Sequence, residues 1–241
     1  MENYLLVMGN KTQLKVDNLE PCTCYFFRIQ LEPEGNWTHF KAATLDAGPY
    51  TLVLHMSRAV KLGKMPLIRK IAHYKPHLLE TENKENKTPL VQAIETGDVQ
   101  VLQLLINLGA NVNTSLFYNK RTPLMIAVYI GKLQMASILV DKGAVTTATD
   151  VNGLNVLHYA VDSGSIENVK FALNLGLDVN CKDNKQWTPL LRAVILNISE
   201  EIINLLLANG ADVKNKDKNG FNFETHRYIA SLYQTSRKLI K

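Results

Sequence analysis

The sequence predicts a mainly α-helical solenoid of about six repeats with a short β segment in front of it, and two recurring motifs carry this prediction. The tripeptide Thr-Pro-Leu begins at residues 88, 122 and 188, and Asn155 begins the equivalent segment between the last two. A glycine-led segment follows these starts by 21 or 22 residues, at positions 109, 143, 176 and 210. Both motifs therefore repeat every 33 or 34 residues, which is typical of stacked helical units.

Residues 86–113 illustrate the local structure that we expect in each unit. Pro89 is suited to the first helical position, because proline lacks an N–H that the first turn would leave unbonded, and Thr88 before it is suited to cap the helix. Gly97 then ends this helix, and the apolar residues at 101–105 form the buried stripe of a second one. A polar stretch follows and projects as a finger toward the next unit. This order of helix, turn, helix and finger resembles the ankyrin repeat, and the resemblance implies an extended binding surface.

The other units repeat the pattern with small departures. In the fifth unit, Ile198 stands where the inner-turn glycine is expected, which predicts a longer and looser turn. Upstream, Ala59 and Gly63 have the spacing of the other units, so we expect a degenerate first repeat whose second helix has Pro66 in its first turn. The last unit lacks the tripeptide and the closing glycine, as a capping repeat does. The predicted domains are a β segment at 1–46 and repeats at 49–82, 83–116, 117–149, 150–182, 183–216 and 217–241.

The β segment is predicted from alternating polar and apolar side chains. One alternating stretch covers Lys11–Val16, a second covers Tyr25–Leu31, and Gly35–Leu45 supplies a loop and a final strand. Between the first two, Leu19–Tyr25 resembles the tyrosine corner of fibronectin type III domains, in which the Tyr hydroxyl bonds back to the backbone beside the turn. Such a sandwich has roughly 100 residues, so we expect its other strands to precede the N-terminus of this chain.

The order of the modules is similar to that of proteins that join a fibronectin type III domain directly to ankyrin repeats, and the linking segment Leu54–Val60 supports the similarity. The resemblance implies a role in the cytosol and nucleus, in transcription control and male germ-cell development. The sequence also lacks the basic and apolar start of a secretory signal and any apolar run near the roughly 18 residues of a membrane span. Cys22, Cys24 and Cys181 fit a reducing compartment better than a disulfide framework. We expect a cytoplasmic or nuclear protein.

No catalytic or metal-binding constellation emerges from the sequence. The six histidines fall in no ligand pattern, and Pro76 interrupts the helix that would place His73 and His77 on one face. His158 and the adjacent Asp-Ser pair at 162–163 nominally supply a catalytic triad, but a histidine at this repeat position bonds to neighbouring backbone instead. We therefore expect no enzymatic activity, no metal and no cofactor.

The side chains expected at the finger tips and on the concave face are candidates for binding a protein partner. Aromatic residues together with arginine are favoured at interface hot spots. Tyr118 and Arg121 are the strongest candidates, because their finger is one residue longer than the two that follow. Trp187 and Phe221 could instead pack against the adjacent finger. The predicted partner-binding residues are Tyr118, Arg121, Tyr159, Asp162, Lys185, Trp187 and Arg192.

Positive charge is concentrated in the first repeat. The formal net charge is +5, and residues 47–79 contain lysines and arginines but no acidic residue. The predicted basic patch consists of Arg58, Lys61, Lys64, Arg69 and Lys70. It either keeps a capping face soluble or binds nucleic acid or an acidic partner, and the absence of interleaved aromatic residues favours the first. The leading hypothesis is a non-enzymatic intracellular adaptor that binds a protein on its concave face, with nucleic-acid or acidic-partner binding as the alternative.

Overall fold

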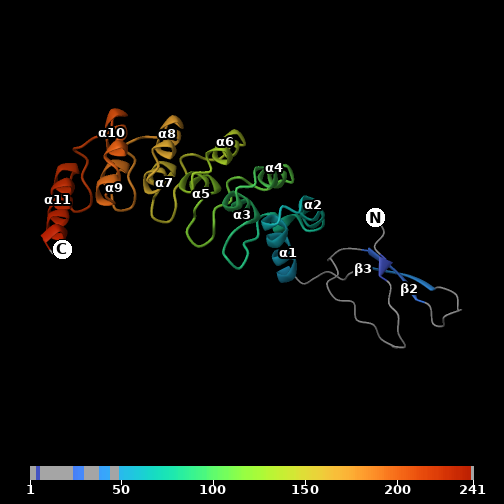
Figure 1. The fold of residues 1–241 in the computed structure, drawn as a ribbon. Coiled ribbons are helices and arrows are strands. Elements are labelled where there is room, and N and C mark those ends of the chain that lie inside the picture. The colour runs from blue at the N-terminus through green and yellow to red at the C-terminus, as the bar shows by residue number, and fades with distance from the viewer. Residues whose placement is uncertain (1–3, 6–23, 30–37, 44–48, 240–241) are drawn as a thin grey trace. The chain divides into compact units, whose positions relative to one another are not determined.

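The computed structural model describes the backbone of residues 4–5, 24–29, 38–43 and 49–239, and the side chains of residues 52–232 (Figure 1). The chain divides into two compact units, Met1–Leu78 and Leu79–Lys241. The described strands are β1 (Tyr4–Leu5), β2 (Cys24–Ile29) and β3 (Thr38–Ala43). The described helices are α1 (Pro49–Lys61), α2 (Met65–Tyr74), the 3-10 helix η1 (Pro76–Leu79), α3 (Pro89–Thr96), α4 (Val99–Asn107), α5 (Pro123–Tyr129), α6 (Leu133–Asp141), α7 (Val156–Asp162), α8 (Ile166–Asn174), α9 (Pro189–Ile195), α10 (Glu200–Ala208) and α11 (Phe223–Leu239).

The strands of the first unit form a small sheet in the order β1-β2-β3. β2 and β3 are antiparallel, with Cys24 opposite Ala43, and β1 runs parallel to β2. The predicted strand at Lys11–Val16 and the corner residues 19–23 lie outside the described residues. The resemblance to a fibronectin type III domain therefore stays a prediction.

Helices α1 and α2 of the first unit pack against each other in the arrangement expected of a first repeat. Gly63, at φ 62°, turns the chain between them, and Pro66 lies in the first turn of α2 as predicted. Val60 of α1 and Ile71 of α2 are buried, so the pair has an apolar interface of its own.

The second unit arranges its helices in two rows (Figure 1). The inner row is α3, α5, α7, α9 and α11, and each of these helices contacts the next. The outer row is α4, α6, α8 and α10, and each of these packs on the inner helix that precedes it. Close approach between the helices depends on small side chains that are fully buried, at Ala93, Ala127, Ala160 and Ala193. The repeat predicted from the sequence is therefore present through this unit.

Each inner helix from α3 to α9 begins at the cap that the motif predicts. The Thr88, Thr122 and Thr188 hydroxyls accept from the backbone N–H three residues on, at 3.3 Å in each case. Asn155 does the same for α7, accepting from the N–H groups of residues 157 and 158. A cap of this kind stabilises a helix by about 1 kcal/mol, so the repeated motif fixes where each unit starts.

The inner turn of the fifth unit departs from the others in the predicted direction. Asn197, at φ 54°, occupies the left-handed position held by Gly97, Gly131 and Gly164 in the earlier units. The outer helix α10 begins at Glu200, three residues later, whereas the earlier outer helices begin two residues after their glycine. The turn is thus one residue longer, as predicted, but the residue in the glycine position is Asn197 and not Ile198. Asparagine tolerates the left-handed conformation there in place of glycine.

The last described helix, α11, is 17 residues long and packs against α9. Asn222 precedes it, and its Oδ1 accepts from the Thr225 N–H at 3.1 Å, so the capping position survives without the tripeptide. No helix in the described part of the chain combines the length and apolar character that crossing a membrane requires.

Candidate functional site

The fingers that join successive units are closed by backbone hydrogen bonds and held by a polar residue at their base. In four of the described fingers this residue is Asn83, Asp150, Asp183 or Asp217, and its side chain accepts from the backbone N–H groups two and four residues on. The three aspartates are buried, with exposures of 4–7%. Their carboxylates therefore accept hydrogen bonds from the backbone inside the fingers and do not face outward.

The finger between α4 and α5 is built differently. Its closing bond runs from the Leu116 N–H to the Arg121 carbonyl at 2.9 Å, so it spans one residue more than the other fingers. Leu116 takes the base position and is buried. The extra residue pushes the tip outward, and Phe117 and Tyr118 are 81% and 82% exposed. The Phe117 N–H is held by Glu82 Oε1 at 2.5 Å, which fixes the base of this tip.

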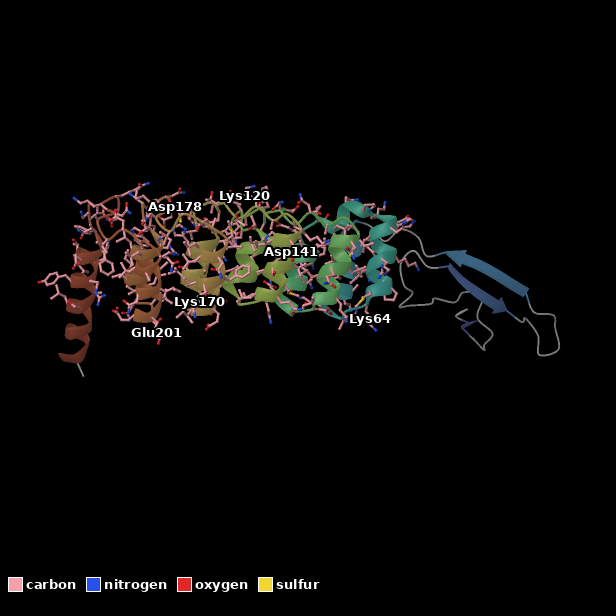
Figure 2. The ribbon with its side chains drawn as sticks, turned by 90° about the horizontal axis from the view of Figure 1, so that it is seen from above. Lys64, Lys120, Asp141, Lys170, Asp178 and Glu201 are labelled. Atoms are coloured by element: carbon pink, nitrogen blue, oxygen red, sulfur yellow. The ribbon has the colours of Figure 1, made fainter. Side chains whose placement is uncertain are left out.

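Neighbouring fingers are bonded to one another along one edge of the second unit. The Val151 N–H donates to the Asn119 carbonyl at 3.1 Å, and the Asn184 N–H donates to the Asn152 carbonyl at 2.9 Å. Lys120 and Asp178, both in fingers, lie along this edge in Figure 2, while Lys170 and Glu201 of the outer helices lie toward the opposite edge. These fingers therefore form a continuous edge of the second unit.

A pocket of about 290 Å³ lies behind the aromatic tip, between the first two fingers of the second unit and the inner helices. Lys87 Nζ bridges Glu95 at 2.7 Å and Glu85 at 3.2 Å at one side of it. The hydrogen bond to Glu95 is the main cause of the raised pKa of Lys87. The other lining residues with aromatic or cationic side chains are Tyr118, Arg121, Tyr129 and Tyr159.

Tyr159 forms the floor of this pocket and is almost fully buried. Its hydroxyl donates to Asp150 Oδ2 at 2.8 Å, and burial, followed by this carboxylate, raises its pKa, so the group stays a neutral phenol. The Tyr129 ring meets it edge-on at 6.1 Å between centroids. The Arg121 guanidinium lies 5.1 Å from the Tyr159 ring centroid in a cation–π contact, and the buried Arg121 Nε has no hydrogen-bond acceptor among the described groups.

Asp162 and Arg192, both predicted to contact a partner, face each other across α7 and α9. Arg192 binds both carboxylate oxygens of Asp162, with Nε on Oδ1 and Nη2 on Oδ2 at 2.7 Å, and its Nη1 is 3.6 Å from Asp183 Oδ2. The Asp162 and Arg192 side chains are only 16% and 15% exposed. Burial alone would lower the pKa of Arg192, but the hydrogen bonds and charge of Asp162 outweigh it and the pKa is raised. These residues join neighbouring units, which leaves little of them for a partner.

Lys185 and Trp187 come together at the tip of the fourth finger of this unit. The Lys185 ammonium lies 4.6 Å from the Trp187 ring centroid, and the half-buried ring packs within its own finger. His158 Nε2 meets the Trp187 carbonyl at 3.2 Å, and His158 Nδ1 accepts from the Asn155 N–H at 3.3 Å. His158 thus bonds to neighbouring backbone as predicted from its repeat position.

The groups that nominally supplied a triad are each engaged elsewhere. The His158 ring is fully buried, the Asp162 carboxylate is bound to Arg192, and the Ser163 hydroxyl donates to the Ala160 carbonyl at 2.6 Å. Within residues 52–232, the His, Cys, Asp and Glu side chains form no cluster that could hold a metal ion.

The predicted basic patch lies on α1, α2 and the turn between them. Arg58, Lys61, Lys64 and Arg69 are exposed and Lys70 is half-buried. The sequence pattern did not single out the pocket residues Glu85, Lys87, Glu95 and Tyr129. A usable signal existed for two of them, since Glu95 and Tyr129 stand seven residues after their caps, at the same repeat position as Asp162.

A family model described as ankyrin repeats (3 copies) matches residues 56–150 and 144–217, which together are more than half of the chain. The chain belongs to the ankyrin repeat family. Ankyrin repeats act in protein–protein interaction through an extended surface and carry no catalytic centre of their own. The family thus confirms the repeats and a role in protein binding, whereas the fibronectin type III resemblance finds no support in it.

The curated relatives match this chain through part of their length. The rat protein named ankyrin repeat and SAM domain-containing protein 6 is 28% identical over 162 residues, which is 67% of this chain and 15% of that protein. Palmitoyltransferase AKR1 of Saccharomyces cerevisiae is 39% identical over 179 residues, or 70% of this chain and 23% of that protein. The mouse 2-5A-dependent ribonuclease is 44% identical over 62 residues, or 25% of this chain and 8% of that protein. The ankyrin repeat chain thus spans less than a quarter of each of these relatives.

Proposed function

We propose that this chain is a non-enzymatic adaptor that binds a protein partner on the fingers and inner helices of its second unit. The observation that carries the proposal is the pair Phe117 and Tyr118, which are 81% and 82% exposed next to a pocket lined by further tyrosines. Burying aromatic side chains of this size contributes strongly to binding, and aromatic residues are enriched at interface hot spots.

The inner helices supply further exposed apolar side chains, of which Tyr129 and Ile130 line the same pocket as Tyr118. Tyr129 at the end of α5 and Leu196 just after α9 are each 45% exposed. Ile130, which follows Tyr129 in the sequence, is 37% exposed. These side chains stand at corresponding ends of the inner helices, so a partner that lies along the row of helices would meet them in turn.

Site-specific photo-crosslinking tests this proposal. A benzophenone amino acid replaces Tyr129 or Leu196 on the inner helices, and Lys170 on outer helix α8 as the control, each in the full chain. We expect one and the same protein from cytosolic and nuclear extract to be crosslinked from the two inner positions and not from Lys170. Crosslinking from Lys170 alone, or equally from all three positions, would contradict the proposal. Each variant must keep the helicity and melting temperature of the unmodified chain.

A place in the cytosol or nucleus, and a role in transcription control and male germ-cell development, belong to the same proposal. Their support is the resemblance of the module order to proteins with a fibronectin type III domain and ankyrin repeats. Imaging of the tagged chain in germ cells is the direct measurement, and confinement to a secretory organelle would contradict it.

A second candidate function is nucleic-acid binding by the basic patch of the first unit. The supporting observation is that Arg58, Lys64 and Arg69 are exposed on α1, on α2 and in the turn between them, a stretch that carries no acidic residue. Phosphate contacts would make such binding strongly salt-dependent. We would measure retention on immobilised double-stranded DNA at 50 and 200 mM NaCl, with Lys64, Arg69 and Lys70 changed to Glu as the comparison. Retention that is unaffected by these changes would remove this candidate.

A further inference from the structure

We infer that the long finger between α4 and α5 binds an extended acidic segment of the partner protein, in which a carboxylate lies within a few residues of an aromatic or aliphatic side chain. This inference rests on the proposed function and adds the chemistry of the partner. Three features of the second unit support it: the aromatic tip, the charge of the finger row and the state of Arg121.

The aromatic tip supplies an apolar contact on two sides. Tyr118 lines the pocket, whereas Phe117 lies outside it with the Lys120 ammonium 5.5 Å from its ring centroid. A pocket of about 290 Å³ is just below the range of small-molecule sites, roughly 300–1,000 Å³, and accommodates one or two protein side chains. An apolar residue of the partner would enter beside Tyr118 and be covered by Tyr129.

The exposed charge at the tips of three fingers is positive, whereas the tip of the first finger carries both Lys84 and Glu85. Lys120, Lys185 and Lys218 are exposed at the tips of three fingers, whereas Asp150, Asp183 and Asp217 are buried at finger bases. The exposed acids of the same connections, Asp178 and Asp212, precede the finger tips in the chain, and Asp178 lies along the same edge as Lys120 (Figure 2). A partner lying across the tips therefore meets lysines, which favours a segment with negative charge.

Arg121 adds a specific site for one carboxylate. Lys87 is paired with Glu85 and Glu95, and Arg192 is paired with Asp162, but the structure gives Arg121 no carboxylate partner among the described side chains. The Arg121 guanidinium lies over the Tyr159 ring in the pocket wall and also interacts with the Tyr159 hydroxyl, whereas its Nε is buried and has no acceptor among the described groups. Arginine can bind a carboxylate through two parallel hydrogen bonds from its terminal nitrogens, so a Glu or Asp of the partner would pair with the Arg121 Nη groups, to which no described carboxylate of the chain is bonded.

The test is a selection from a library of random 12-residue peptides displayed on phage, with the full 241-residue chain as bait. We expect the recovered peptides to share an Asp or Glu within about four residues of an aromatic or aliphatic residue. The most frequent peptide is then synthesised with a fluorophore and titrated by anisotropy. We expect about 30-fold weaker binding to a chain with Phe117→Ser and Tyr118→Ser, the loss typical of a hot spot.

Charge variants separate the roles of the two kinds of cation. Arg121→Lys keeps the charge but removes the paired hydrogen bonds, and we expect about 10-fold weaker binding. Lys120→Glu should weaken binding and also reduce its dependence on salt between 50 and 300 mM NaCl. The matched controls are Lys170→Glu on the opposite edge (Figure 2) and Tyr228→Ser on α11, both at exposed positions, and they should change the affinity less than about twofold. All variants must melt like the unchanged chain.

Three results would overturn this inference: recovered peptides without acidic residues, no recovered peptide at all, or equal binding by the Phe117 and Tyr118 variant. Tight binding of a 20-nucleotide DNA strand that depends on Lys120 and displaces the peptide would also overturn it, because the partner class would be wrong. The proposed function is tested separately by crosslinking at Tyr129 and Leu196. A partner crosslinked there together with failure of the peptide selection would leave the adaptor function standing and refute only the acidic chemistry.

Discussion

Gly153, at the tip of the third finger, is needed for two separate reasons, and these yield a quantitative prediction. Its φ is +80°, a conformation that costs an L-residue about 1–2 kcal/mol. A Cβ at this position would also lie 2.7 Å from Asn184 Oδ1 and 2.9 Å from the Asn184 nitrogen. That nitrogen donates to the Asn152 carbonyl at 2.9 Å, and Asn184 Nδ2 donates to the Val151 carbonyl at 3.0 Å. Alanine would therefore disturb both bonds between the fingers.

Gly220 separates the two reasons, because it has the same tip position in the last finger. Its φ is +81°, and no atom lies within 4 Å of its Cβ position. Gly220→Ala should cost only the backbone contribution, about 1 kcal/mol after the lower unfolded-state entropy of alanine is included. Gly153→Ala adds the weakening of two hydrogen bonds, so we expect a loss of about 2–3 kcal/mol. Gln186, with φ 63° at the equivalent tip, should gain about 0.5 kcal/mol when changed to Gly.

The assay is urea unfolding of the full chain, followed by circular dichroism at 222 nm. Repeat arrays lose stability most easily at their ends, so Gly176→Ala serves as a control inside the array, at a glycine with φ +72° and open space at its Cβ position. Losses for Gly153→Ala and Gly220→Ala that agree within about 0.3 kcal/mol would refute the contact between the fingers as a source of stability. A gain for Gly153→Ala would refute the backbone reasoning as well.

Three further predictions concern side chains between neighbouring units. Arg192→Gln leaves the carboxylates of Asp162 and Asp183 without their cation, and we expect a loss of about 2 kcal/mol in urea unfolding, whereas no loss would mean that the pair is dispensable. Burial, partly offset by the backbone hydrogen bond, lowers the pKa of His158 below 6.5, so its contribution to stability is complete above pH 6.5 and is lost as the pH falls through the folded-state pKa. The melting temperature should therefore fall more steeply from pH 7.5 to 5.5 than in His158→Gln, and equal slopes would contradict this. Burial raises the pKa of Cys181 to about 11, so in a chain with Cys22→Ser and Cys24→Ser we expect alkylation by iodoacetamide at pH 8 to be at least about 10-fold slower than in urea, as read by mass spectrometry.

The spacing of the motifs predicted much of the candidate site, but not which of its side chains face a partner and which bind a neighbouring repeat. The count of residues between motifs identified the long finger and selected Tyr118 and Arg121. The same reasoning grouped Asp162 and Arg192 with them, although these two side chains bind each other across a sequence separation of 30 residues. Whether a charged side chain faces a partner or a neighbouring unit depends on contacts between units, which the pattern inside one unit does not contain.

The repeat could be read from the sequence because its signals are local. Thr88, Thr122 and Thr188 mark helix starts through hydrogen bonds that span three residues, and the closing glycines end the outer helices within a few residues. Only the tertiary structure decided the chemistry of the surface. The long finger closes between Leu116 and Arg121, which extends its tip, and Arg121 lies over Tyr159 without a carboxylate partner among the described side chains. Both features arise where one repeat packs on the next. Burial and charge pairing there are set by distances between residues far apart in the chain, and local sequence patterns do not encode those distances.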